Sequence, residues 1–133
     1  MRYKPVQYLA FLNLAVLSVL GAASANAQEI ALKNGESADL GAVYWISNCR
    51  SLLKSFAGVD VLEGPPGVVL SIREDMVYAR RQNCPNKVPG GIVVATAKDV
   101  QSKASGILRY RVRYNTSDGE RQSTHSVQIS LYP

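Results

Sequence analysis

The strongest constraint on the fold is a strict alternation of apolar and polar residues near the C-terminal end of the chain. Two alternating runs, ILRYRVRY at 107–114 and STHSVQISLY at 123–132, flank the sequence NTSDG at 115–119. A period of two places alternate side chains on opposite faces of a strand, and Asn, Asp and Gly favour a tight turn. The sequence therefore predicts a β-hairpin that buries one face and exposes the other.

Shorter segments rich in β-branched and aromatic residues precede this hairpin, and Gly, Pro and Asn separate them. The expected strands cover residues 29–34, 38–47, 59–64, 68–81 and 92–100. Segment 68–81 reads either as one strand with a bend or as two short strands. With the hairpin, about seven short strands predict an all-β fold, a single antiparallel β-sandwich.

Residues 48–58, NCRSLLKSFAG, are the one segment with helical features. Asn48 is a suitable N-cap and Gly58 a suitable stop. Leu52, Leu53 and Phe56 have the spacing of a helix face that packs inward. We therefore expect one short helix here, although the sequence alone leaves open whether SLLKSF is helix or loop.

The first 27 residues have the composition of a targeting segment. A basic start, MRYK, is followed by the apolar run YLAFLNLAVLSVLGAA and by the small residues SANA. This order predicts a cleavable signal peptide over residues 1–27 and a mature domain over residues 28–133. We therefore expect export to the periplasm or the extracellular space, and we expect no transmembrane segment in the mature chain.

Two cysteines, Cys49 and Cys84, both follow the signal peptide. An even number of cysteines in an exported chain indicates a disulfide bond. The pair encloses 34 residues, for which loop entropy gives a stabilisation of about 4 kcal/mol. A structural zinc site would need four ligands, and the chain has only one His besides these cysteines, so we expect the disulfide and no metal.

The mature domain is mildly basic. Removal of residues 1–27 takes away Arg2 and Lys4, which leaves 13 basic and 10 acidic residues, a net charge of +3 (13 − 10). Such a balance points weakly toward an anionic partner.

Several pieces of the chain resemble the small secreted bacterial proteins that have an immunoglobulin-like β-sandwich. They are VYWIS at 43–47, the cysteine pair, VPGGIVVATAKD at 88–99 and the closing hairpin. The resemblance implies one immunoglobulin-like domain over residues 28–133. The chain departs from antibody domains because Trp45 precedes Cys49 and because Gln82 stands where a Tyr is usual. The disulfide is therefore expected to tie a loop or the short helix to a strand end.

The sequence lacks the residue patterns of a catalytic centre. His125 is the only histidine. Glu74 and Asp75 are adjacent, which sends them to opposite faces of a strand. Asp118 and Glu120 do not have the spacing of a calcium loop. We therefore expect no enzymatic activity, no cofactor and no metal site.

Three arginines alternate with apolar residues in the strand at 107–114. If the apolar residues face the core, Arg109, Arg111 and Arg113 project from the outer face about 6.5–7 Å apart, and Arg121 on the partner strand would join them. We take this row as the candidate contact surface for phosphate, sulfate or carboxylate groups, although a solvated sheet face that hinders edge-to-edge aggregation is the more common origin of such a row. No aromatic residue shares this face, so nucleic acid is not expected.

Arg80 and Arg81, beside the loop QNCPNK, form a second candidate basic site.

The expected function is that of an exported, non-enzymatic module that binds a protein or an anionic polymer of the envelope or extracellular space. The alternative is a structural or assembly subunit of the envelope or of a surface polymer that pairs through its strand edges.

Overall fold

The computed structural model describes residues 29–133 and contains, within that range, nine β-strands and one short 3-10 helix. The strands are β1 (Glu29–Lys33), β2 (Ser37–Val43), β3 (Ile46–Ser47), β4 (Arg50–Ser51), β5 (Leu53–Glu63), β6 (Val68–Val77), β7 (Val88–Ala97), β8 (Ala104–Thr116) and β9 (Gly119–Tyr132). The helix η1 (Arg80–Gln82) lies between β6 and β7.

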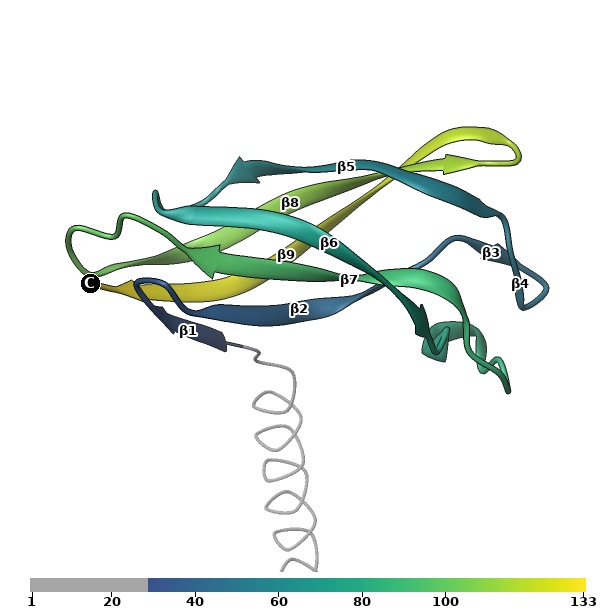
Figure 1. Ribbon diagram of the computed structural model, residues 1–133, viewed down its shortest axis with the longest axis horizontal. Helices are drawn as coiled ribbons and strands as arrows, with labels where there is room; N and C mark the ends of the chain where they lie inside the picture. The colour runs from purple at the N-terminus through teal and green to yellow at the C-terminus, as the bar shows by residue number, and fades with distance from the viewer. Residues whose placement is uncertain (1–28) are drawn as a thin grey trace, which may run out of the picture.

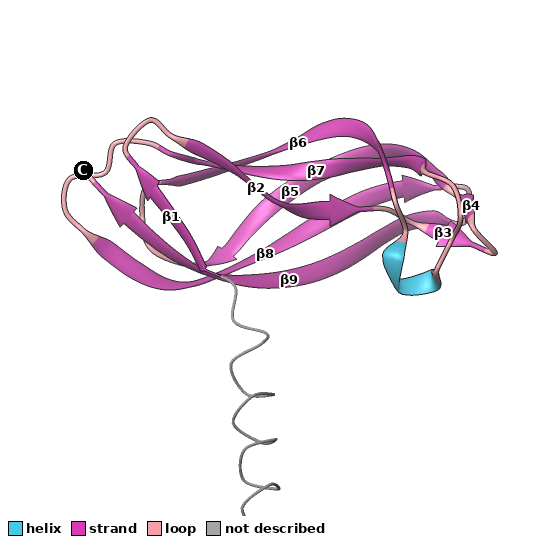
Figure 2. Ribbon diagram, turned by 90° about the horizontal axis from the view of Figure 1, so that it is seen from below, coloured by secondary structure: helices cyan, strands magenta, loops and turns pink. Residues whose placement is uncertain are grey.

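Seven of these strands form two sheets that pack face to face (Figure 1). Sheet A has the strand order β1-β9-β8-β5, and sheet B has the order β2-β7-β6. Neighbouring strands are antiparallel except β1 and β9, which are parallel. The short strands β3 and β4 pair with each other near η1, at one end of the long axis (Figure 2). The expected all-β architecture is confirmed.

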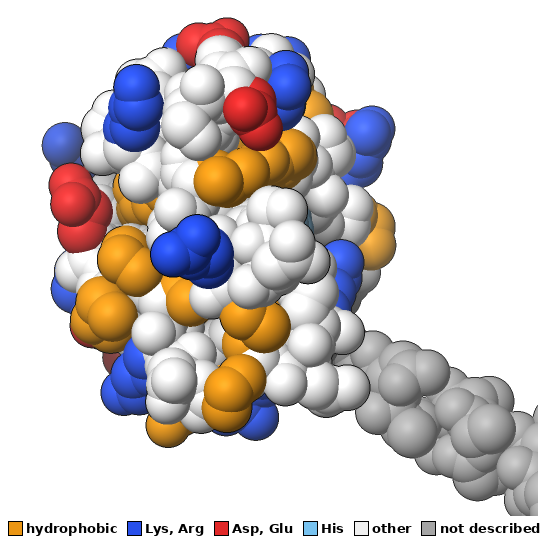
Figure 3. All heavy atoms as spheres, turned by 90° about the vertical axis from the view of Figure 1, so that its right-hand side faces the viewer, with side chains coloured by type: hydrophobic (Ala, Val, Ile, Leu, Met, Phe, Trp, Pro, Cys, Tyr) orange, Lys and Arg blue, Asp and Glu red, His pale blue; other side chains and the backbone are white. Residues whose placement is uncertain are grey.

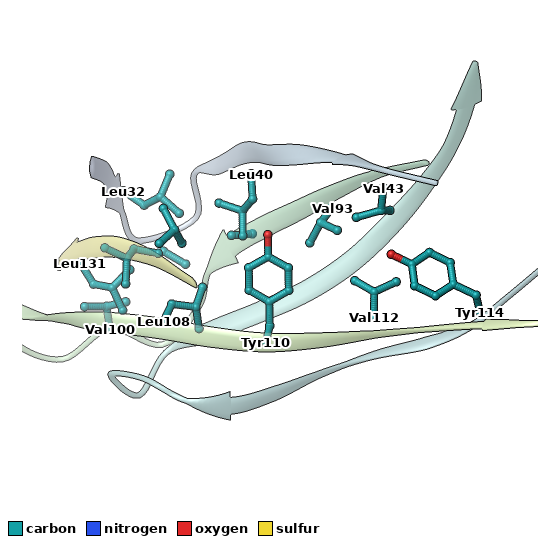
Figure 4. Packing of buried hydrophobic residues seen from close by; sticks show 14 residues of the cluster. Leu32, Leu40, Val43, Val93, Val100, Leu108, Tyr110, Val112, Tyr114 and Leu131 are labelled. Atoms are coloured by element: carbon teal, nitrogen blue, oxygen red, sulfur yellow. The ribbon is translucent and has the colours of Figure 1, made fainter. Parts of the chain in front are cut away.

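The core lies between the two sheets, where inward-facing side chains of both meet (Figure 4). On β8 every second residue from Leu108 to Tyr114 is at most 4% exposed. The other strands of both sheets contribute Leu32, Leu40, Val43, Val93, Ala95, Ala97, Val127, Ile129 and Leu131. Full burial of a large apolar side chain contributes on the order of 1.5–3 kcal/mol, so the alternation seen in the sequence is a principal source of stability.

Strands β8 and β9 form the predicted hairpin. They pair in unbroken register from Ala104 opposite Leu131 to Thr116 opposite Gly119. At the turn, the Thr116 hydroxyl donates to the Gly119 carbonyl at 2.7 Å and accepts from the backbone N–H of Asp118 at 3.1 Å. Gly119 has φ of +100°, a conformation that favours glycine.

The prediction of a helix over residues 48–58 is wrong, because this segment forms β4 and the first half of β5. Leu53, Phe56 and Val59 all pack against the core, at a spacing of three residues. Strand β5 makes this spacing possible because its register against β8 shifts between Leu53 and Ser55 and again between Phe56 and Gly58. Each β-bulge inserts one extra residue, so two bulges turn the usual period of two into a period that imitates a helix.

The predicted disulfide between Cys49 and Cys84 is present. Cys49 lies in the turn between β3 and β4, and Cys84 lies in the loop between η1 and β7. The bond therefore joins two loops at one end of the sandwich and does not cross its core. Within residues 29–133 no cysteine is free.

The expected signal peptide, residues 1–27, lies outside the described range, so export stays a prediction. Among residues 29–133, no helix has the length and apolar character that crossing a bilayer requires.

Close packing around Gly90, among the strands of sheet B, gives a test of this fold. A Cβ at Gly90 would lie 2.5 Å from the Val43 carbonyl oxygen and 2.7 Å from Cγ2 of Val77. We expect Gly90→Ala to lower the free energy of unfolding by about 1–3 kcal/mol, measured by urea denaturation. Gly41→Ala is the matched control, because a Cβ there meets no atom within 4 Å. Equal stability of the two variants would contradict the packing described here.

Candidate functional site

The predicted arginine row lies on the outer face of sheet A. Arg109, Arg111 and Arg113 alternate with the buried residues of β8. Across the hairpin they stand opposite Ser126, Thr124 and Gln122, respectively. The outward direction of these three arginines and the polar character of the facing residues agree with the sequence analysis.

Each arginine of the row has a carboxylate partner on β5. Arg113 Nε and Arg111 Nη2 lie 2.9 and 3.2 Å from Oδ2 of Asp60, and Arg109 Nη1 lies 3.0 Å from Oε1 of Glu63. The hydrogen bond from Arg113 is the largest cause of a lowered pKa of Asp60. Three guanidinium groups thus face two carboxylates, which leaves the row with little unopposed charge for a partner.

Arg121 does not belong to this row. It pairs with Tyr114 in the β8–β9 register, and residues directly opposite in a ladder share one face of the sheet. Tyr114 is buried between the sheets, so Arg121 lies on the inner face, the same face as Ser123 and His125.

A cleft opens between the two sheets along the inner face of β9. Strand β1 covers β9 only from Gln128 to Tyr132, so Gly119–Val127 pair with β8 alone. Opposite this part of β9 lies β2, the edge strand of sheet B. Two adjoining hollows of about 350 and 390 Å³ occupy the gap and share Ala42, Val43, Arg81 and His125. We call this region the β2–β9 cleft.

A hydrogen-bonded chain of side chains lies in the cleft. The hydroxyl oxygens of Tyr114 and Ser123 are 2.5 Å apart, and Ser123 Oγ lies 2.8 Å from Nε2 of His125. The His125 ring stacks on Tyr110, with centroids 5.3 Å apart, and Tyr114 packs against Trp45 at 5.2 Å. These contacts hold the polar groups in fixed positions, so the cleft is preorganised to receive a ligand.

His125 has a lowered pKa because burial disfavours its charged form and because Arg81 lies nearby.

A Ser–His pair is also part of hydrolytic centres. Here, however, Tyr114 shares the Ser123 hydroxyl, and no Asp or Glu is among the described residues that line the two hollows. The described residues also contain no group of three or more His, Cys, Asp or Glu placed to hold a metal. The arrangement therefore suits hydrogen bonding to a ligand better than bond cleavage.

Two disulfide-linked loops border the cleft. Residues 44–52 and 78–87 contain Arg50, Arg80, Arg81 and Lys87 but no acidic residue. Figure 3 looks onto this end and shows basic, acidic and exposed apolar side chains spread over it. We call these two segments the basic loops. Tyr44, Trp45 and Ile46 from the first loop and Gln82 from the second also line the cleft.

The sequence analysis found Arg80 and Arg81 but not the cleft. A signal for the cleft was nevertheless present in the sequence. Ser123 and His125 continue the inward phase of Val127, Ile129 and Leu131, and polar residues at buried positions indicate a gap in the core.

The ion pairs of the arginine row predict an effect of removing Asp60. Asp60→Asn takes the carboxylate away from Arg111 and Arg113, so we expect the variant to elute from a heparin column at higher salt than the wild type. Glu74→Gln is the matched control, because it makes the same change in net charge at an exposed residue of β6. Equal shifts for both variants would mean that net charge alone determines retention.

The lowered pKa of His125 predicts a loss of stability in mild acid. As the pH falls below the usual value of 6.5, the unfolded chain binds a proton at His125 before the folded chain does. The free energy of unfolding therefore decreases until the folded-state pKa has been passed. We expect His125→Gln to lack this part of the pH dependence. Because the chain has one His, an NMR titration of its imidazole gives the folded-state pKa directly, and a value at or above 6.5 would contradict the prediction.

Comparison of the chain with protein-family models, with curated proteins and with solved structures finds no match in any of the three. Function must therefore be inferred from the cleft, the basic loops and the arginine row themselves.

Proposed function

We propose that the chain is an exported, non-enzymatic binding module with an immunoglobulin-like fold. Lettered A to G in chain order, the seven main strands give the orders B-E-D for sheet B and A-G-F-C for sheet A. The B-E-D and C-F-G groups are those of immunoglobulin domains, and the first strand differs by pairing with the last. The signal peptide predicted from the sequence and the disulfide support an oxidising compartment, the periplasm or the extracellular space.

The binding surface in this proposal is the β2–β9 cleft together with the basic loops. The observation that carries it is that the two basic loops, which contain four basic and no acidic residues, supply Arg81 and other lining residues to a preorganised hollow. Concave sites with a few fixed polar groups are the usual places of ligand binding. The arginine row is the weaker surface because Asp60 and Glu63 occupy its guanidinium groups. The partner is a protein or an anionic polymer of the envelope or the extracellular space.

Affinity capture from the envelope and the medium of the producing cells tests this proposal, with the oxidised domain as bait. The loop variant carries Arg50→Ser, Arg81→Ser and Lys87→Ser. The row variant carries Arg109→Ser, Arg111→Ser and Arg113→Ser and loses the same number of charges. We expect a saturable partner that the wild type and the row variant retain, that the loop variant loses and that salt weakens.

The opposite pattern, loss with the row variant alone, would return the binding surface to the outer face of sheet A. A partner held equally by all three proteins would show that neither basic surface is the site.

A second candidate function is assembly through the edge of β6. This strand pairs with β7 without a register shift over Val68–Val77, and among the described residues its other edge has no strand partner. Val69 and Met76 on β6 are 49% and 48% exposed. A long, regular edge with exposed apolar side chains is typical of strands that pair with another chain. Light scattering over a range of concentrations separates the two functions, since a persistent monomer counts against assembly.

A further inference from the structure

We infer that the β2–β9 cleft takes an extended, acidic peptide segment of a partner protein, which adds to sheet A alongside Gly119–Val127 of β9. The inference rests on the proposed binding function and specifies its partner class and its binding mode. Three features of the described residues support it: the free edge of β9, the apolar hollow beside that edge, and the positive charge of Arg81 and Arg121 on the inner side of that edge.

The free edge of β9 provides the backbone contacts. Strand β1 already adds to this edge, but its pairing with β9 begins at Gln128 and continues to Tyr132. From Gly119 to Val127, β9 pairs with β8 alone. Alternate residues of an edge strand direct their N–H and C=O groups away from the sheet. An extended peptide in line with β1 would satisfy these groups, which is the recognition mode called β-strand addition.

The hollow beside this edge provides room for side chains. Val43, Trp45 and Ile46 form its apolar wall, while Ser123 and His125 form its polar wall. In an added strand, alternate side chains point inward. We therefore expect alternate side chains of the peptide to enter the cleft, apolar ones against Val43, Trp45 and Ile46 and acidic ones beside Arg81 and Arg121. The intervening positions remain outside the cleft.

The charge around the cleft favours an acidic peptide. Arg81 lines both hollows, Arg121 lies on the same face of β9 as Ser123, and the basic loops contain no acidic residue. His125 adds no charge near neutral pH, because its pKa is lowered. Arg81 and Arg121 are thus the groups that would pair with carboxylates of the peptide.

A nine-residue peptide with Ser at every second position, and with Val and Glu in turn at the positions between, is the probe for this inference. Its Val and Glu side chains share the face that enters the cleft. Trp45 is the only tryptophan of the chain and lines the cleft, so its fluorescence reports binding. In an added strand only alternate peptide N–H groups face β9. Two further peptides therefore carry N-methyl groups, one on its Val and Glu residues and the other on its Ser residues, and a fourth peptide has Lys in place of Glu.

We expect one N-methylated peptide to bind at least about tenfold more weakly than the parent, since it loses several backbone hydrogen bonds to β9. The other N-methylated peptide keeps nearly the parent affinity, and the Lys peptide does not bind. Arg81→Ser weakens binding by about fivefold, whereas Arg109→Ser, a matched loss of charge on the outer face, leaves it unchanged. Backbone NMR shifts caused by the parent peptide are expected to concentrate at Gly119–Val127.

Equal binding by both N-methylated peptides, or shifts concentrated on β5 and β6, would overturn strand addition at β9. Absence of binding by every peptide would overturn it as well. If the loop variant still loses its captured partner in that case, the proposed binding function stands and the partner is of another class, such as an anionic polysaccharide.

Discussion

The fold depends on the two-sided pairing of β8, which pairs with β9 along its whole length and with β5 from Arg109 to Thr116. Its inner face supplies four of the most buried side chains, from Leu108 to Tyr114. Its outer face supplies the three arginines that hold Asp60 and Glu63 of β5. One alternating sequence therefore determines both the core and the outer surface of the sheet.

The elements that sequence reasoning predicted well are those with a regular period. The β8–β9 hairpin and the outward direction of Arg109, Arg111 and Arg113 follow from alternation alone, and the disulfide follows from the parity of the cysteines. Strand β5 was not predictable in the same way, because its bulges give Leu53, Phe56 and Val59 a helical spacing. The strand expected at 59–64 contains Asp60 and Glu63, but its pairing with β8 was not predicted. The carboxylate partners of the arginines therefore stayed unrecognised, since an ion pair across strands depends on register.

The β2–β9 cleft was not predictable because it results from a difference in strand length. Strand β1 is five residues long and β9 is fourteen, so most of the β9 edge is left without a neighbour. The tyrosines and His125 occupy the space that a longer first strand would cover. The disulfide holds the two loops beside this space together, which lowers the entropy lost when they bind a partner.

The bulges of β5 also affect how many partners sheet A accepts. A strand that joins an edge needs evenly spaced N–H and C=O groups, and three register shifts along β5 disturb that spacing. Sheet A thus has one receptive edge and one unreceptive edge. Continuous growth into a fibre requires a receptive edge on both sides of every copy. Strand addition at β9, as proposed, would therefore give closed complexes, with one partner for each domain.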